Sequence, residues 1–175
     1  MKGRTVGILN GNHYGEFQSG ITTDQKLADM LQCRFLGVAS LVQIQFVKGT
    51  KPFASVILYA HHGKGGGATI GGSMNPVQRM QLIAEADIYL MGDNHQKSVA
   101  FDSRIRLGMG GGKVKVRDRK ILLARTGSFL KAYEDDQKSY VADMCLKPAD
   151  LGVVKITLTP KSENDYDFID IHASV

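Results

Sequence analysis

The chain has 175 residues, 43% of them hydrophobic, which suits one globular domain spanning residues 1–175 with a core of its own. The formal net charge of +5 is compatible with a phosphate-bearing partner without requiring one. Two widely separated cysteines, no apolar run long enough to cross a bilayer and no signal-peptide core argue against a disulfide scaffold, a membrane protein and a secreted one, so we expect a soluble, cytoplasmic protein.

The first half of the sequence alternates apolar runs with amphipathic stretches, which is the pattern of strands and helices in an α/β sheet. Strands are predicted over residues 4–9, 41–47, 53–60 and 87–91. The runs at 4–9, 53–60 and 87–91 should be buried, and 53–60 is apolar on both faces apart from Ser55, so we expect it to be buried on both faces. The run at 41–47 alternates apolar and polar residues and should be half exposed.

Two helices are predicted between these strands. The first is capped at residues 22–24 and runs to about Cys33. Leu27, Met30 and Leu31 fall on one face of it. The second is capped by Asn75, with Pro76 in the first helical position, where its missing N–H costs nothing. Its buried stripe consists of Val77, Met80, Ile83 and Ala84.

From residue 98 onward the pattern changes to short strands with few helices. These strands are predicted over residues 98–106, 113–117, 120–125, 152–158 and 166–172. An α/β first half and a mostly β second half predict an α/β (α+β) fold. A two-sheet β-sandwich flanked by helices would bury both halves.

Four of the five histidines directly follow predicted buried strands: His13, His61, His62 and His95. Ligands bind to open α/β sheets in the crevice beyond the carboxyl ends of the strands, and three separate strand ends each bring an imidazole there. A single loop histidine is more often simply solvated, but three such loops together favour a shared metal site. Imidazole nitrogens with an amide oxygen and a carboxylate suit zinc, manganese or iron, whereas the absence of thiolates argues against a structural zinc site.

These loops carry a recognisable pattern. Gly11-Asn12-His13, after a predicted strand, resembles the Gly-Asn-His motif of the calcineurin-like metallophosphoesterases. His62-Gly63 resembles the lone metal-binding histidine of that family, and Gly92-Asp93-Asn94-His95 resembles its Gly-His-x-His motif. The order and spacing match over nearly the whole chain. Residues 59–63, with their glycine tail, and residues 126–130 look like those of members associated with phages and mobile elements.

The resemblance implies hydrolysis of a phosphomonoester or phosphodiester, with a nucleic acid or a nucleotide as one form of that phosphate-ester substrate. In this family two divalent ions hold the phosphate and lower the pKa of the attacking water. By the resemblance, Asn12 and His62 ligate one ion and His95 the other, with Asp93 as a further oxygen ligand. His13 acts as the general acid, because the unperturbed pKa of an imidazole lies near neutrality.

The sequence departs from the family pattern in three places. The Asp-x-His and Gly-Asp-x-x-Asp motifs of the family precede Gly-Asn-His, and the eleven residues before Asn12 leave no room for them. We therefore expect an N-terminal truncation and impaired metal binding, with a non-catalytic remnant of the fold as the alternative. Tyr14 replaces a usually acidic residue, and Asp93 replaces the first histidine of Gly-His-x-His, although its oxygen can still ligate a hard metal. Whether His61 or His62 is the ligand stays open.

Three other signals allow two readings each. The glycine-rich residues 63–67 lack P-loop spacing and form either an active-site loop or a flexible surface loop. Asp170-Ile171-His172 matches Asp-x-His, but we interpret it as part of an ordinary final strand. Alternating cations predict a strand face that is either solvated or binds nucleic acid. They are Lys113, Lys115, Arg117 and Arg119, with Arg104 and Arg106 added if the strands pair.

Overall fold

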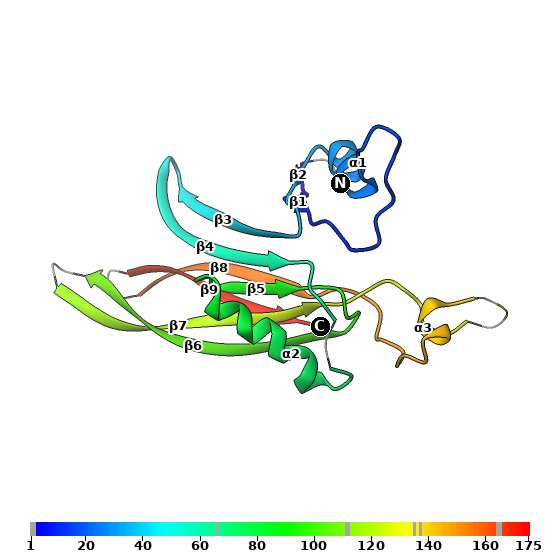
Figure 1. Cartoon of the computed structure of the whole chain (residues 1–175). Coiled ribbons are helices and arrows are strands. Elements are labelled where there is room, and N and C mark those ends of the chain that lie inside the picture. The colour runs from blue at the N-terminus through cyan, green and yellow to red at the C-terminus, as the bar shows by residue number, and fades with distance from the viewer. Residues whose placement is uncertain (1–2, 66, 111–112, 135, 137, 164–165) are drawn as a thin grey trace.

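The structure is a computed structural model that describes residues 3–65, 67–110, 113–134, 136, 138–163 and 166–175 (Figure 1). Within these residues the helices are α1 (Thr23–Leu31), α2 (Ile70–Arg79) and α3 (Tyr140–Asp143), with a 3₁₀ turn, η1, at Met80–Leu82. The strands are β1 (Gly7–Ile8), β2 (Arg34–Phe35), β3 (Ala39–Lys48), β4 (Lys51–His61), β5 (Ile88–Met91), β6 (Lys97–Gly110), β7 (Lys113–Thr126), β8 (Lys155–Glu163) and β9 (Tyr166–Ser174). The mixed α/β class, rich in strands, is confirmed.

A five-stranded mixed sheet with the order β3-β4-β5-β7-β6 forms the centre of the molecule. The strands β4, β5 and β7 run parallel, while β3 and β6 pair antiparallel at the two edges. The carboxyl ends of the three parallel strands therefore meet at one edge of the sheet, where ligands of open α/β sheets bind. The segments that follow His61, Met91 and Thr126 all begin at this edge.

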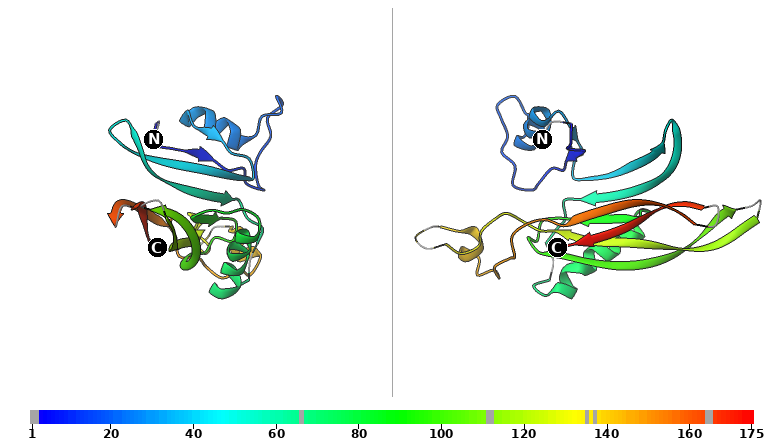
Figure 2. Two further views of the ribbon diagram at one scale, coloured as in Figure 1. Left: turned by 90° about the vertical axis from the view of Figure 1, so that its left-hand side faces the viewer. Right: turned by 180° about the vertical axis from the view of Figure 1, so that it is seen from behind.

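Each face of the sheet carries its own apolar cluster, because successive side chains of a strand point to opposite faces. On one face α2 and η1 pack through Val77 and Met80. They contact Tyr59, Tyr89, Ile121 and Leu123 of the sheet. On the other face the β8–β9 hairpin packs through Ile171 and Ala173. They contact Val56, Ile88 and Leu122. The second layer described here is thus a two-stranded sheet, with α2 on the opposite side (Figures 1 and 2).

The N-terminal part is a small unit in which α1 packs on the parallel pair β1 and β2 (Figure 1). The predicted cap is confirmed, since Thr22 and Gln25 form a capping box. The predicted buried strand over residues 4–9 is reduced to the two half-buried residues of β1. Leu27 and Met30, which share the predicted apolar face of α1, are exposed. The pair of short strands covers only the stripe around the buried Ala28.

The start of α2 differs from the prediction. Thr69, not Asn75, is the N-cap, and its hydroxyl accepts from Gly72 N at 3.2 Å, so Pro76 lies inside the helix. A side chain on Gly67 would lie 2.9 Å from the Cα of Gly72, so only glycine allows the loop to cross the first turn this closely. Ile83 is exposed because the 3₁₀ turn ends the helical periodicity before it.

One buried carboxylate ties three central strands together. Asp87, at the start of β5, is fully buried and accepts from the backbone N of Ile57 in β4 at 2.8 Å. It also forms an ion pair with Arg119 of β7. The sequence predicted two strands, 113–117 and 120–125, but β7 is one continuous strand. Its polar residues between 117 and 120 stay in the strand because they pair with β6 without a break.

Candidate metal centre at the carboxyl edge of the sheet

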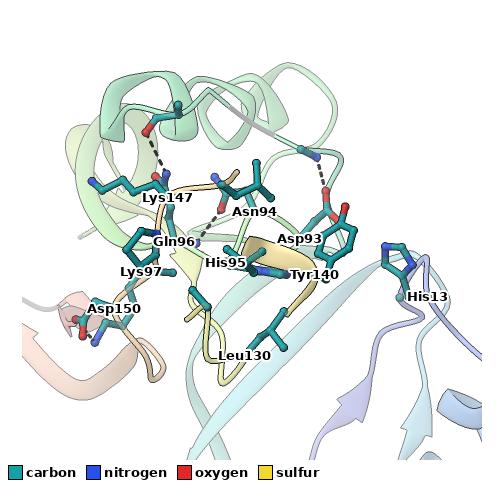
Figure 3. Close-up of a pocket in the computed structure, with 18 of the residues that line it drawn as sticks. His13, Asp93, Asn94, His95, Gln96, Lys97, Leu130, Tyr140, Lys147 and Asp150 are labelled. Atoms are coloured by element: carbon teal, nitrogen blue, oxygen red, sulfur yellow. Dashed lines mark hydrogen bonds and ion pairs between the residues drawn. The ribbon is translucent and has the colours of Figure 1, made fainter. Parts of the chain in front are cut away.

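A cleft of about 1110 Å³ opens at the carboxyl edge of the parallel strands (Figure 3). All five residues predicted to form the site line it: Asn12, His13, His62, Asp93 and His95. They come from three loops, which follow β1, β4 and β5. The sequence predicted that these side chains follow strand ends. In the structure they lie in loops after strand ends.

Two of these side chains each place an oxygen close to the same nitrogen of His62. His62 Nε2 lies 3.1 Å from Asn12 Oδ1 and 3.4 Å from Asp93 Oδ1. Two atoms that each ligate one ion at about 2.1 Å are about 3.0 Å apart at a right angle and about 3.4 Å apart at the tetrahedral angle. The separations around His62 Nε2 match those of neighbouring ligands in a coordination shell. One imidazole nitrogen and two oxygens fit Mn²⁺, Zn²⁺ or Fe²⁺.

The loop that carries Asp93 is held in an uncommon backbone conformation. Asp93 and His95 have φ values of 72° and 59°, in the left-handed region that costs a side-chain-bearing residue about 1–2 kcal/mol. Asp93 Oδ2 accepts from the backbone N of Gly65, which leaves Oδ1 facing His62. The backbone conformation thus directs one carboxylate oxygen to the glycine-rich loop and the other to the imidazole. This supports the reading of residues 63–67, of which 66 lies outside the described residues, as a loop of the site.

The loop that carries Asn12 is held by two hydrogen bonds from the residues just before it. Gly11 N donates to Asp24 Oδ2 at 2.8 Å, and Asn10 N donates to Gly37 O at 2.8 Å. His62 N in turn donates to Val38 O at 2.8 Å. Residues 37–38 therefore bind both the loop of Asn12 and the residue that follows β4. Asp24 was expected only as part of a helix cap, and no feature of the sequence marked it as a residue that positions Asn12.

His61 and His62 make different contacts, which bears on the choice that the sequence left open. His61 Nδ1 accepts from Gly63 N at 2.8 Å and so supports the turn that follows β4. His62 reaches the cleft because adjacent side chains at a strand end point in opposite directions. The geometry therefore favours His62 as the ligand candidate.

His13 and His95 line the cleft without joining the cluster of three. The ring of His13 approaches Tyr140 edge-on, with 6.2 Å between the ring centroids. Among the described residues, no group of three His, Cys, Asp or Glu side chains is placed to hold one ion. The third donor beside His62 and Asp93 is the amide oxygen of Asn12, and His95 stands apart from them in the same cleft.

A buried arginine holds the loops of the cleft in place through hydrogen bonds to their carbonyl groups. The sequence did not single it out. Arg125, near the end of β7, is fully buried, which lowers its pKa, and the charge of Asp93 partly offsets this effect. Its guanidinium donates to Ser73 O at 2.8 Å, Gly92 O at 2.7 Å and Gly65 O at 3.1 Å. It thereby joins α2, the glycine-rich loop and the Asp93 loop. A charged residue at the end of the apolar run 121–124 was the available signal.

The predicted cationic face exists, but much of its charge is matched within the molecule. The register of β6 and β7 places Arg104 opposite Arg119 and Arg106 opposite Arg117. Arg106 pairs with Glu85 and Arg119 with Asp87, while Arg104 donates to Gln81 Oε1 at 3.3 Å. Arg117 lies over the ring of Tyr166, 3.7 Å from its centroid. The side chain of Lys113 lies outside the described residues. This pairing disfavours a nucleic-acid surface here.

Asp170 belongs to an ordinary strand, as interpreted from the sequence. It lies in β9 and pairs with Lys161 at 2.7 Å, a hydrogen bond that lowers the pKa of the carboxyl.

No protein-family model, curated protein or solved structure matches this chain. Among the residues that the structure describes, none of the helices is both long and apolar enough to cross a membrane.

Proposed function

We propose that this chain is a metal-dependent phosphoesterase of the calcineurin-like type, which hydrolyses phosphomonoesters or phosphodiesters, nucleotides and nucleic acids included. The observation that carries the proposal is the approach of Asn12 Oδ1 and Asp93 Oδ1 to His62 Nε2 at ligand-to-ligand distances. The motif resemblance and the location at the ends of parallel strands support it.

The side chains divide the work as follows. Asn12, His62 and Asp93 hold a divalent ion, with manganese, zinc or iron as the candidates. When bound, such an ion polarises the phosphate and lowers the pKa of the attacking water. His13, in protonated form, donates its N–H to the leaving oxygen. By the resemblance, His95 serves a second ion on the same side of the cleft.

The fold proposed for the chain is the two-sheet sandwich of this family, as a single domain. Its support is the β8–β9 hairpin, which packs on the face of the central sheet opposite α2. We take this hairpin as the counterpart of the second sheet. The alternative function, a remnant without activity, draws support from the donor set, because the cluster has only one imidazole and one carboxylate within contact.

Replacing His13 by alanine tests the proposal. Turnover of a dinucleotide phosphodiester with saturating Mn²⁺ should fall about 10²- to 10⁴-fold, the usual contribution of a general acid, because its alkoxide leaving group needs the proton that His13 donates. The Mn²⁺ affinity should stay unchanged, since His13 lies outside the cluster of three donors.

His172→Ala is the matched control, because His172 is an exposed histidine of β9 that does not line the cleft. It should retain full turnover. Absence of both bound metal and turnover in the unaltered chain, at every Mn²⁺, Zn²⁺ and Fe²⁺ concentration, would support the remnant instead.

A further inference from the structure

One wall of the cleft comes from a single segment, here named the strap: residues 128–134, 136 and 138–151. The two ends of the strap lie close together. Gly127 N donates to Gln96 O at 3.1 Å, and Gly152 N donates to Ser128 O at 2.9 Å. A side chain on Gly127 would lie 2.4 Å from Gly152 O, so the two ends approach as closely as only glycine permits. Both ends of the strap are therefore fixed to the sheet.

Further contacts keep the strap in one shape. Lys97 Nζ pairs with Asp150 Oδ2 at 2.7 Å and donates to Leu151 O at 3.1 Å. Within the strap, the hydroxyl of Tyr133 donates to Leu146 O at 2.9 Å, and Val141 is buried. A wall held in this way is formed before a ligand arrives, so a ligand does not have to order it.

The strap presents apolar surface to the cleft. Leu130, Tyr140 and Leu146 line the cleft and are 44%, 54% and 44% exposed. In Figure 3, Leu130 and Tyr140 extend from this segment, whereas His13 comes from the loop after β1 and Asp93 from the loop after β5. The cleft thus has a polar side with metal-ligand donors and an apolar side that the phosphate chemistry does not use. Lys147 adds a positive charge to the apolar side.

We infer that the strap is a subsite for an aromatic leaving group of a phosphate ester, such as a nucleobase-bearing or an aryl group; the inference rests on the proposed function. The ring of Tyr140 lies edge-on to His13, with 6.2 Å between centroids. Because His13 protonates the leaving oxygen, the leaving group starts beside His13 and its ring comes to lie against Tyr140. A flat ring on an exposed tyrosine buries apolar area on both partners and stacks well.

Two phosphonates that cannot be hydrolysed test the inference, since binding alone is measured. Phenylphosphonate and methylphosphonate share the charged group and differ in the ring. Calorimetric titration of the full chain with Mn²⁺ should give about tenfold tighter binding of phenylphosphonate, the gain typical of one stacked ring. Tyr140→Ala should reduce this preference to about twofold or less, and Tyr140→Phe should keep it.

Phe129→Ala is the matched control, because Phe129 is a 77% exposed aromatic residue of the strap that does not line the cleft. It should keep the tenfold preference. Equal affinity of the two phosphonates for the unaltered chain would overturn the inference alone. So would a Tyr140→Ala variant that loses affinity for both equally, because the ring would then support the site and not the ligand. Failure of both phosphonates to bind, with and without Mn²⁺, would overturn the proposed function and the inference with it.

Discussion

Replacing His62 by alanine should weaken Mn²⁺ binding by at least about 100-fold, whereas the same change at His61 should leave the affinity within about twofold. His62 Nε2 is the shared neighbour of Asn12 Oδ1 and Asp93 Oδ1, so its loss removes the only imidazole from the cluster of three donors. His61 Nδ1 instead accepts from Gly63 N and supports the turn. Titration of Mn²⁺ followed by electron paramagnetic resonance measures both variants.

His61→Ala is a close control for His62→Ala, because the two variants have the same composition and the substituted positions are adjacent. Circular dichroism and the urea midpoint show whether each variant folds. Equal Mn²⁺ affinity for both variants would contradict the site. A larger loss at His61 than at His62 would mean that the turn after β4 presents the other imidazole to the cleft.

Replacing Arg125 by methionine should cost both stability and metal affinity. Three carbonyls, of Gly65, Ser73 and Gly92, lose their donor, and the bond to Ser73 O is buried, so the free energy of unfolding should fall by about 3–5 kcal/mol. Two of these carbonyls belong to the loops that place Asp93: Gly65 also donates its N–H to Asp93 Oδ2, and Gly92 precedes Asp93. Mn²⁺ binding should therefore weaken by about 10- to 100-fold, the usual effect of a residue that orients a ligand.

Arg119→Met is the control that separates a role of Arg125 in positioning Asp93 from a general loss of stability. Arg119 lies on the same strand and its loss leaves the buried Asp87 without its cation, so the loss of stability should be comparable, at about 3–5 kcal/mol. Asp87 lies at the opposite end of β5 from Asp93, so the Mn²⁺ affinity should stay within about threefold. Urea unfolding and Mn²⁺ titration give the two quantities. An equal loss of affinity in both variants would assign Arg125 a purely structural part.

The local patterns of the sequence predicted most of the central sheet, and the residues predicted for the site line one cleft. The apolar run at 53–60 and the alternation at 41–47 gave β4 and β3, and the histidines after predicted strands gave the cleft. These predictions succeed because strand burial and loop position depend on residues close in the chain. The metal, the substrate and the family stay predictions.

The parts that failed depend on contacts between distant residues. The start of α2 at Thr69 depends on Gly67 crossing over Gly72, which no local preference reveals in a glycine-rich stretch. Arg125 serves loops 33 to 60 residues away in the sequence, so its part is visible only after the strands are ordered.

The most direct measurement is anomalous X-ray diffraction from crystals of the full chain equilibrated with Mn²⁺. The account predicts an anomalous peak within about 2–2.3 Å of His62 Nε2, Asn12 Oδ1 and Asp93 Oδ1 together. A well-ordered cleft with no peak at millimolar Mn²⁺, or with a peak that touches none of these three atoms, would contradict it.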